Sequence, residues 1–133
     1  MGGNLYGSNF SQESLFKFQS DAIQKAASEG SCVFMGRCAD YILRDFENVV
    51  NVFITASMDF RVDIVSKVKQ LDAEHARKLI EHVETRRAQY YNYYTGKKWG
   101  AAESYDLCVD ASLLGLEETE KLIADFIRKR FGL

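Results

Sequence analysis

The run VVNVFIT, residues 49–55, decides the fold class, because a short apolar run of this kind is typical of a strand buried on both faces. Two similar runs occur elsewhere in the chain. SCVFMG occupies residues 31–36 and ends at a glycine, and DLCVD occupies residues 106–110. The sequence therefore predicts three buried strands.

Helical patterns separate these runs. Residues 11–29 carry apolar side chains at helical spacing, with Ser11 as the candidate N-cap. Ser57 can cap a second helix, and Asp72 can cap a third, in which one apolar stripe of helical period continues to Gly96. Strand-like and helical segments thus alternate along the chain.

A last helix is predicted from about Leu116 to Phe131, with acidic residues at its start and basic residues at its end, as the helix dipole favours. The alternation of helices with buried strands predicts an α/β fold, a three-layer parallel sheet with flanking helices. Residues 1–11 are rich in Gly, Ser and Asn and are predicted to form an irregular arm. No linker divides the chain, so residues 1–133 are expected to form a single domain.

Composition narrows the class of protein. A chain of 133 residues, 47% hydrophobic and 27% charged, is typical of one soluble globular domain. The net charge of -2 argues against coating of nucleic acid, so no nucleic-acid partner is expected. The sequence shows neither a secretion signal nor an apolar run of about 18 residues, and a cytoplasmic location without a membrane partner is expected.

The chain has three cysteines, Cys32, Cys38 and Cys108. They lack the pair spacing of metal sites, which favours reduced thiols and no metal ligand.

Parallel sheets bind ligands beyond the carboxyl ends of their strands, so the residues that follow each predicted strand are candidates for a site. Arg37 comes directly after the run at 31–36. A guanidinium in such a place must reach either solvent or an anion, and phosphate is the natural anion. From the residues alone, a structural salt bridge with Asp40 or Asp45 is an equal alternative.

Four segments of the chain together resemble one family. They are GRCADYILRD (36–45), NVFITASMDFRV (51–62), RRAQYYNYYTGKKWG (86–100) and YDLCVDASLLG (105–115). In this order and spacing they resemble the cytidylate kinase-like branch of the nucleoside monophosphate kinases, from about residue 13 onward. The resemblance implies a P-loop kinase-like fold, with residues 72–100 as a lid-like helix and loop. It also implies phosphoryl transfer from ATP, with Mg²⁺, to a nucleoside monophosphate such as CMP or dCMP.

The resemblance implies roles for single residues as well. Arg37 is expected to grip the monophosphate or its sugar, with Asp40 as a nearby polar partner. Arg61 is expected to contact the donor phosphates. Arg86 and Arg87 stand where lid arginines approach the transferring group. Because adjacent residues lie about 100° apart on a helix, only one of these two is expected to face the nucleotides, and which one stays open.

Other residues of the lid and of the last strand allow two interpretations each. Lys98 can reach phosphates from a mobile loop, although a solvated turn is the plainer interpretation. Tyr90, Tyr91 and Tyr94 keep the helical period, which favours packing over base stacking. Asp110 lies either at the edge of the nucleotide site or in a capping position.

The phosphate loop of the family has no counterpart in this sequence. GGNLYGSN, residues 2–9, keeps the G-x-x-x-x-G spacing, but Ser8 stands where a lysine is expected and no strand precedes it, so the match is interpreted as coincidence. The chain is therefore expected to be incomplete or inactive as a kinase. The alternative is a catalytically dead nucleotide-binding, regulatory or interaction module on the same fold. Without the family's central strand, a homodimer through an exposed strand edge is a further hypothesis.

Overall fold

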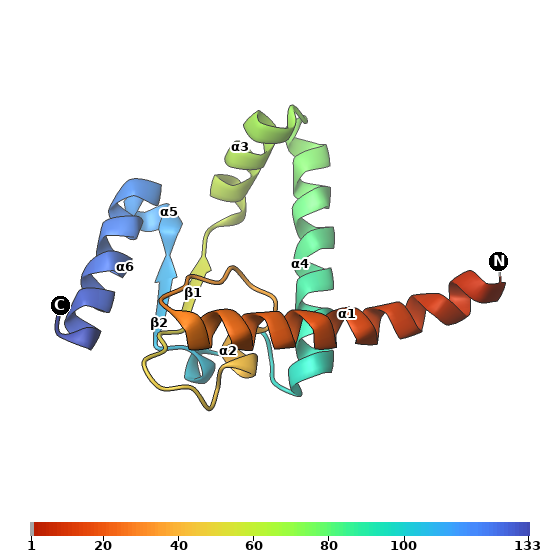
Figure 1. Cartoon of the computed structure of the whole chain (residues 1–133). Coiled ribbons are helices and arrows are strands. Elements are labelled where there is room, and N and C mark those ends of the chain that lie inside the picture. The colour runs from red at the N-terminus through yellow and green to blue at the C-terminus, as the bar shows by residue number, and fades with distance from the viewer. Residues whose placement is uncertain (1) are drawn as a thin grey trace. The chain divides into compact units, whose positions relative to one another are not determined.

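The computed structural model describes the backbone of residues 2–133 and the side chains of residues 12–133. It is a mixed α/β structure with a small parallel sheet of two strands and flanking helices (Figure 1). The chain groups into two compact units, Met1–Glu47 and Asn48–Leu133. The single domain expected over residues 1–133 stays a prediction.

The first unit begins with the long helix α1, Gly2–Glu29. The predicted irregular arm over residues 1–11 is therefore wrong for residues 2–10, and Ser11 lies inside the helix instead of capping it. The chain contains no proline, so every backbone N–H of this segment can donate to the helix. A helix that is already nucleated extends into Gly, Ser and Asn residues at a cost of about 1 kcal/mol or less for each.

A short helix, α2 (Ala39–Ile42), packs against α1 in the same unit. The buried apolar side chains of the unit are Ile23, Cys38, Ile42 and Leu43. The Nε2 of Gln24 donates a hydrogen bond of 3.5 Å to the carbonyl of Ile42. The end of α1 and α2 thus share one small apolar core.

The predicted strand at residues 31–36 is wrong, because residues 31–35 have no regular secondary structure. Its apolar side chains are not buried: Val33 is 89% exposed and Met35 is 84% exposed. A strand exists only where a second strand satisfies its backbone groups, and the described part of Met1–Glu47 contains none. The apolar pattern of residues 31–36 indicates strand propensity, but it contains no information about a neighbouring strand.

The second unit contains the sheet. Strands β1 (Val52–Thr55) and β2 (Leu107–Asp110) pair in parallel, in a register that runs from Val52 opposite Leu107 to Thr55 opposite Asp110. The strands predicted at 49–55 and 106–110 are confirmed, although β1 is shorter than expected. Before β1, the backbone N–H of Asn51 donates to Oδ2 of Asp106 at 2.7 Å, which ties the two strand entrances together.

Two antiparallel helices, α3 (Met58–Lys69) and α4 (Ala73–Thr95), connect the strands (Figure 1). Their predicted caps are confirmed. The Oγ of Ser57 accepts from the N–H of Phe60 at 3.2 Å, and Oδ1 of Asp72 accepts from the N–H of His75 at 2.8 Å. Gly96 ends α4 in a left-handed conformation, φ +69°.

After α4 the chain passes through the 3₁₀ turn η1 (Ala102–Ser104) to β2 and then to α5 (Ala111–Leu114) and α6 (Leu116–Phe131). The predicted last helix is confirmed, with Glu117 and Glu118 in its first turn and basic residues in its last. Across the described residues, no helix has both the length and the apolar character needed to span a membrane.

Candidate functional site

Arg37 sits in a strained turn. Gly36, Arg37 and Cys38 all have left-handed backbones, with φ of 70°, 60° and 59°. The N–H of Ala39 donates to the carbonyl of Gly36 at 3.2 Å, which closes a turn with two left-handed central residues, as in type I′. For residues other than glycine this conformation costs about 1 to 2 kcal/mol each.

The side chain of Arg37 is exposed and, within the described part of the chain, makes no ion pair. The alternative of a structural salt bridge with Asp40 or Asp45 is therefore wrong for this structure. Asp40 lies two residues further on, in the first turn of α2, and is half-buried. The turn thus presents a guanidinium that is not neutralised by a neighbouring carboxylate.

Cys38, the next residue after Arg37, has the opposite environment. It is buried, and burial first and the charge of Asp40 second raise the pKa of its thiol to about 11. At neutral pH it is a protonated, apolar-like side chain and not a nucleophile. Cys32 and Cys108 are exposed free thiols.

The described residues contain no cluster of three or more His, Cys, Asp or Glu side chains that could hold a metal ion.

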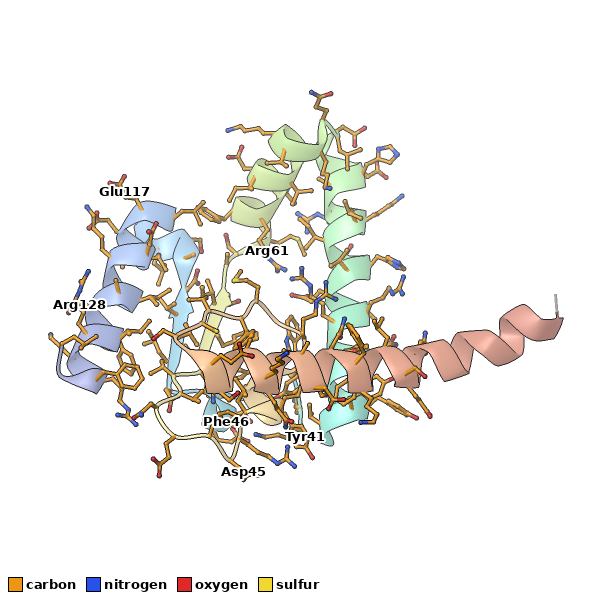
Figure 2. All side chains as sticks on the ribbon, viewed as in Figure 1. Tyr41, Asp45, Phe46, Arg61, Glu117 and Arg128 are labelled. Carbon is orange, nitrogen blue, oxygen red and sulfur yellow. The ribbon has the colours of Figure 1, made fainter. Side chains whose placement is uncertain are left out.

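Arg61 connects α3 to α4 (Figure 2). Its Nη1 donates to Oε1 of Glu84 at 2.9 Å, and the two side chains are 31% and 46% exposed. The Nε of Arg61 is buried and lacks a hydrogen-bond partner among the described residues. The guanidinium is therefore held at one nitrogen and unsatisfied at another.

Arg86 and Arg87 lie on different sides of α4. Both are exposed. Arg87 belongs to the stripe formed by Ile80, Glu84 and Tyr91, since these positions are separated by four, three and four residues. Ile80 and Tyr91 are buried, so this stripe is the inner side of α4. Arg86 lies about 100° away around the helix. Arg87, and not Arg86, therefore shares a helix face with the Arg61–Glu84 pair.

The loop after α4 packs on β1. The ring of Phe53 contacts Trp99, with centroids 5.3 Å apart, and Tyr105, with centroids 4.9 Å apart. The N–H of Trp99 donates to Oδ1 of Asn92 at 2.8 Å, and the N–H of Gly100 donates to the hydroxyl of Tyr105 at 3.3 Å. The tryptophan of this segment is thus a packing residue that anchors the loop.

Lys98 is exposed on this anchored loop and makes no ion pair with any residue that the structure describes. Tyr91 is buried, and Tyr90 and Tyr94 are half-buried with ring centroids 4.7 Å apart, as the packing interpretation predicts. Tyr93 is 73% exposed. Tyr93 lies off the apolar stripe of α4, so the helical pattern of the sequence does not indicate it.

A polar network joins the carboxyl ends of β1 and β2. Asp110 caps α5: its Oδ1 accepts from the N–H of Ser112 at 2.9 Å and also from the Ser112 hydroxyl. The Oγ of Ser112 in turn accepts from the N–H of Ser57 at 3.1 Å. The capping interpretation of Asp110 is confirmed. The link to Ser57 joins residues 55 positions apart in the chain, which the sequence analysis did not find.

A groove of about 510 Å³ lies between α3 and α4. It is lined by charged residues of both signs, among them Asp59, Asp63, Lys67 and Arg77. Asp59 and Arg77 also form an ion pair at 3.6 Å across the two helices. None of the predicted site residues lines this groove, so it is not the candidate site.

Comparison with known proteins gives two positive results. Residues 1–113 match the model of the cytidylate kinase-like family. The chain is also similar to a solved structure, the crystal structure of an uncharacterized protein from Eubacterium ventriosum ATCC 27560, with a TM-score of 0.82 and 28% sequence identity. The match covers 86% of this chain and 65% of that one, so the chain spans less than two thirds of its length. No match was found among the curated proteins.

Proposed function

Because the chain belongs to the cytidylate kinase-like family, we propose that it carries the acceptor and lid residues of a nucleoside monophosphate kinase-like transferase. The proposed acceptor is CMP or dCMP, and the proposed donor is ATP. The observation that carries the proposal is Arg37, an exposed guanidinium with no ion pair among the described residues, presented by a left-handed turn. Strained backbone of this kind is typical of functional sites.

In this proposal Arg37 binds the monophosphate. A guanidinium can donate two parallel N–H groups to two phosphate oxygens, and such charge-assisted pairs are stronger than neutral hydrogen bonds. Asp40 is the nearby polar partner, positioned by α2. Its carboxylate accepts hydrogen bonds and is suited to a sugar hydroxyl or to the exocyclic amine of cytosine.

Arg61 and Arg87 are the proposed catalytic cations. Phosphoryl transfer spreads negative charge over the oxygens of the transferring group, so catalysis is mainly positioning and neutralisation of charge. Arg87 is preferred over Arg86 because it shares its helix face with Glu84, the partner of Arg61. Lys98 is the proposed additional cation, on a loop that Trp99 anchors to β1.

The donor ATP would supply the transferred phosphoryl group, with Mg²⁺ as its counter-ion. Magnesium in kinases is usually held by the phosphates and by one or two carboxylates. No group of three or more potential metal ligands occurs in the part of the chain that the structure describes. No residue of this chain is assigned to the metal.

The fold proposed for the whole domain is the three-layer parallel sheet of P-loop kinases. Family membership supports it, together with the parallel pairing of β1 and β2 through a helical connection. In that arrangement β1 and β2 would be two strands of a larger sheet.

A second candidate is a nucleotide-binding module without kinase activity. The observation that favours it is the conformation of residues 2–9, the stretch with G-x-x-x-x-G spacing: it is part of α1 and does not form a loop whose N–H groups could cradle phosphates. Binding of CMP is expected under both candidates. Turnover of ATP separates them.

The test is calorimetric titration of the chain with CMP. We expect binding in the wild type and a loss of at least about tenfold in Arg37→Ala, since a lost charge-assisted pair to phosphate is worth about 1.5 to 3 kcal/mol. Arg128→Ala is the matched control, because Arg128 is an exposed arginine of α6 (Figure 2). Absence of CMP binding in the wild type, or equal affinity in Arg37→Ala, would contradict the proposal.

A further inference from the structure

The pair Arg61–Glu84 differs from most ion pairs of the described chain. Most of the others join residues three or four positions apart on one helix, as Lys67 and Asp63 do. Among the described residues, two ion pairs join α3 to α4, and Arg61–Glu84 is the shorter and less exposed of them, at 2.9 Å against 3.6 Å for Arg77–Asp59. It is therefore the stronger charged contact between these two helices that the structure describes.

The pair is also incomplete. Glu84 engages Nη1 of Arg61 through one carboxylate oxygen, and the buried Nε has no acceptor among the residues that the structure describes. Arginine–carboxylate pairs are frequently bidentate, and a buried donor without an acceptor carries a desolvation cost. Arg61 is thus held to Glu84 by a single hydrogen bond from Nη1, which an incoming anion can replace.

A second cation lies close to this pair along α4. Arg87 is three residues after Glu84, on the same helix face, is exposed, and makes no ion pair among the residues described. Arg61, Glu84 and Arg87 therefore belong to one part of the α3–α4 hairpin. The carboxylate lowers the net positive charge that an incoming anion meets.

We propose that Glu84 is a positioning residue that acts as an internal competitor: its carboxylate holds Arg61 in the unliganded protein and yields Nη1 to a phosphate group of the ligand. The ligand class is the polyphosphate chain of a nucleoside triphosphate. The inference rests on the proposed function, because that function assigns Arg61 to the donor phosphates. It adds that affinity at this site is limited by a carboxylate of the protein itself.

The experiment measures the affinity of inorganic pyrophosphate for the intact chain by calorimetry. Glu84→Gln keeps the size of the side chain and its Oε1 acceptor but removes the negative charge, so Arg61 stays positioned without competition. We expect pyrophosphate to bind about fivefold more tightly, the factor that corresponds to a partly exposed ion pair. Glu81→Gln is the matched control, since Glu81 is an exposed acid of the same helix, and its affinity is expected to equal that of the wild type.

A double-variant comparison separates competition from a general charge effect. In an Arg61→Gln background, Glu84→Gln is expected to bring no gain in pyrophosphate affinity. A gain that persists there would mean that the charge acts through another group, and would overturn the inference. Equal or weaker binding by Glu84→Gln in the wild-type background, including no measurable binding by either protein, would overturn it as well. A purely structural role predicts a lower Tm for Glu84→Gln without any gain in affinity.

The outcome is distinguishable from failure of the proposed function, which is tested with a different ligand and a different residue. Binding of CMP that depends on Arg37, with no effect of Glu84→Gln on pyrophosphate, would refute the inference alone. A gain in pyrophosphate affinity without any CMP binding would refute the proposed function alone.

Discussion

Two adjacent residues of one turn show how environment sets chemistry at the residue scale. Arg37 and Cys38 share the same left-handed backbone, yet one side chain is exposed and the other is 5% exposed. Exposure keeps the guanidinium available to an anion, while burial keeps the thiol protonated. In this turn the side chain of Arg37 faces solvent, and the side chain of Cys38 lies in the small core of the first unit.

The first prediction concerns this thiol. With a pKa of about 11, Cys38 has about one thiolate per thousand molecules at pH 8. We expect a thiol reagent to modify Cys32 and Cys108 rapidly and Cys38 at least about 100-fold more slowly, which time-resolved mass spectrometry of the labelled peptides would show. Because the pKa of the Cys38 thiol in the folded protein is above its ordinary value of 9.0, the stabilisation from the buried thiol is present at neutral pH and is lost as pH rises from 9 toward 11. Rapid modification of all three thiols in the native protein would contradict this prediction.

A second prediction concerns Gly100. Its φ is +83°, and a Cβ at this position would lie 3.3 Å from Cζ of Phe53. Gly100→Ala is therefore expected to lower the free energy of unfolding by about 1 to 2 kcal/mol, measured by urea denaturation. Gly30→Ala is the control, because its added methyl meets nothing within 4 Å and no left-handed φ is required there. A neutral Gly100→Ala would show that the loop does not pack on β1 as described.

At the scale of elements, local signals predicted most of the second unit. The caps Ser57 and Asp72 and the stop at Gly96 bound α3 and α4, and each acts through groups within four residues in sequence. The run at 31–36 was predicted as a strand and is not one, because strand formation depends on a partner that the local pattern does not contain. The start of α1 was missed for a related reason: helix propagation overrides the low propensity of single residues.

In the candidate site, too, the sequence indicates some residues, while the contacts between them depend on the fold. Sequence and resemblance named the arginines, but the choice between Arg86 and Arg87 depends on which face of α4 is buried. The pairing of Arg61 with Glu84 spans 23 positions and two helices, so no local pattern indicates it. Glu84, a carboxylate close to Arg86 and Arg87 in the sequence, was the one signal that could have suggested it.

The third prediction tests the cap of α3. In Ser57→Ala the N–H of Phe60 loses its side-chain acceptor. We expect a loss of about 1 kcal/mol in the free energy of unfolding, measured by urea denaturation. Ser66→Ala in the interior of the same helix is the control and is expected to be neutral or slightly stabilising, because alanine has the higher helix propensity. Equal stability of the two variants would contradict the capping role.

The fourth prediction follows from the cap of α4. The pKa of Asp72 is lowered, first by the backbone N–H of His75 and then by its side chain. A lowered folded pKa stabilises the protein above the unfolded value, and this stabilisation is lost as pH falls below about 3.8 toward the folded pKa. Asp72→Asn keeps a cap without a titrating group. Thermal unfolding between pH 5 and 2 should therefore show a shallower decline of Tm for Asp72→Asn than for the wild type, and identical slopes would contradict the assignment.

At the scale of the whole molecule, two features favour self-association: the edges of the two-stranded sheet and the exposed apolar side chains of segment 31–35. Each strand of a two-stranded sheet has one edge without a ladder partner, and the apolar residues Val33 and Met35 are exposed in the irregular segment 31–35. Uncovered edges and apolar segments promote pairing with other chains. The hypothesis of a homodimer through an exposed strand edge therefore leads to a measurable expectation.

The last prediction is concentration-dependent self-association. Light scattering is expected to give a mass above the 15.2 kDa of one chain, rising with protein concentration. The double variant Val33→Lys/Met35→Lys places charge on the segment, and charged residues are among the devices that block edge pairing, so its mass is expected to stay near that of one chain. Val68→Lys is the control, because Val68 is a 72% exposed valine on α3, outside the irregular segment 31–35. A wild type that keeps the mass of one chain at every concentration, or association unchanged in the double variant, would mean that residues 31–35 do not mediate pairing between chains.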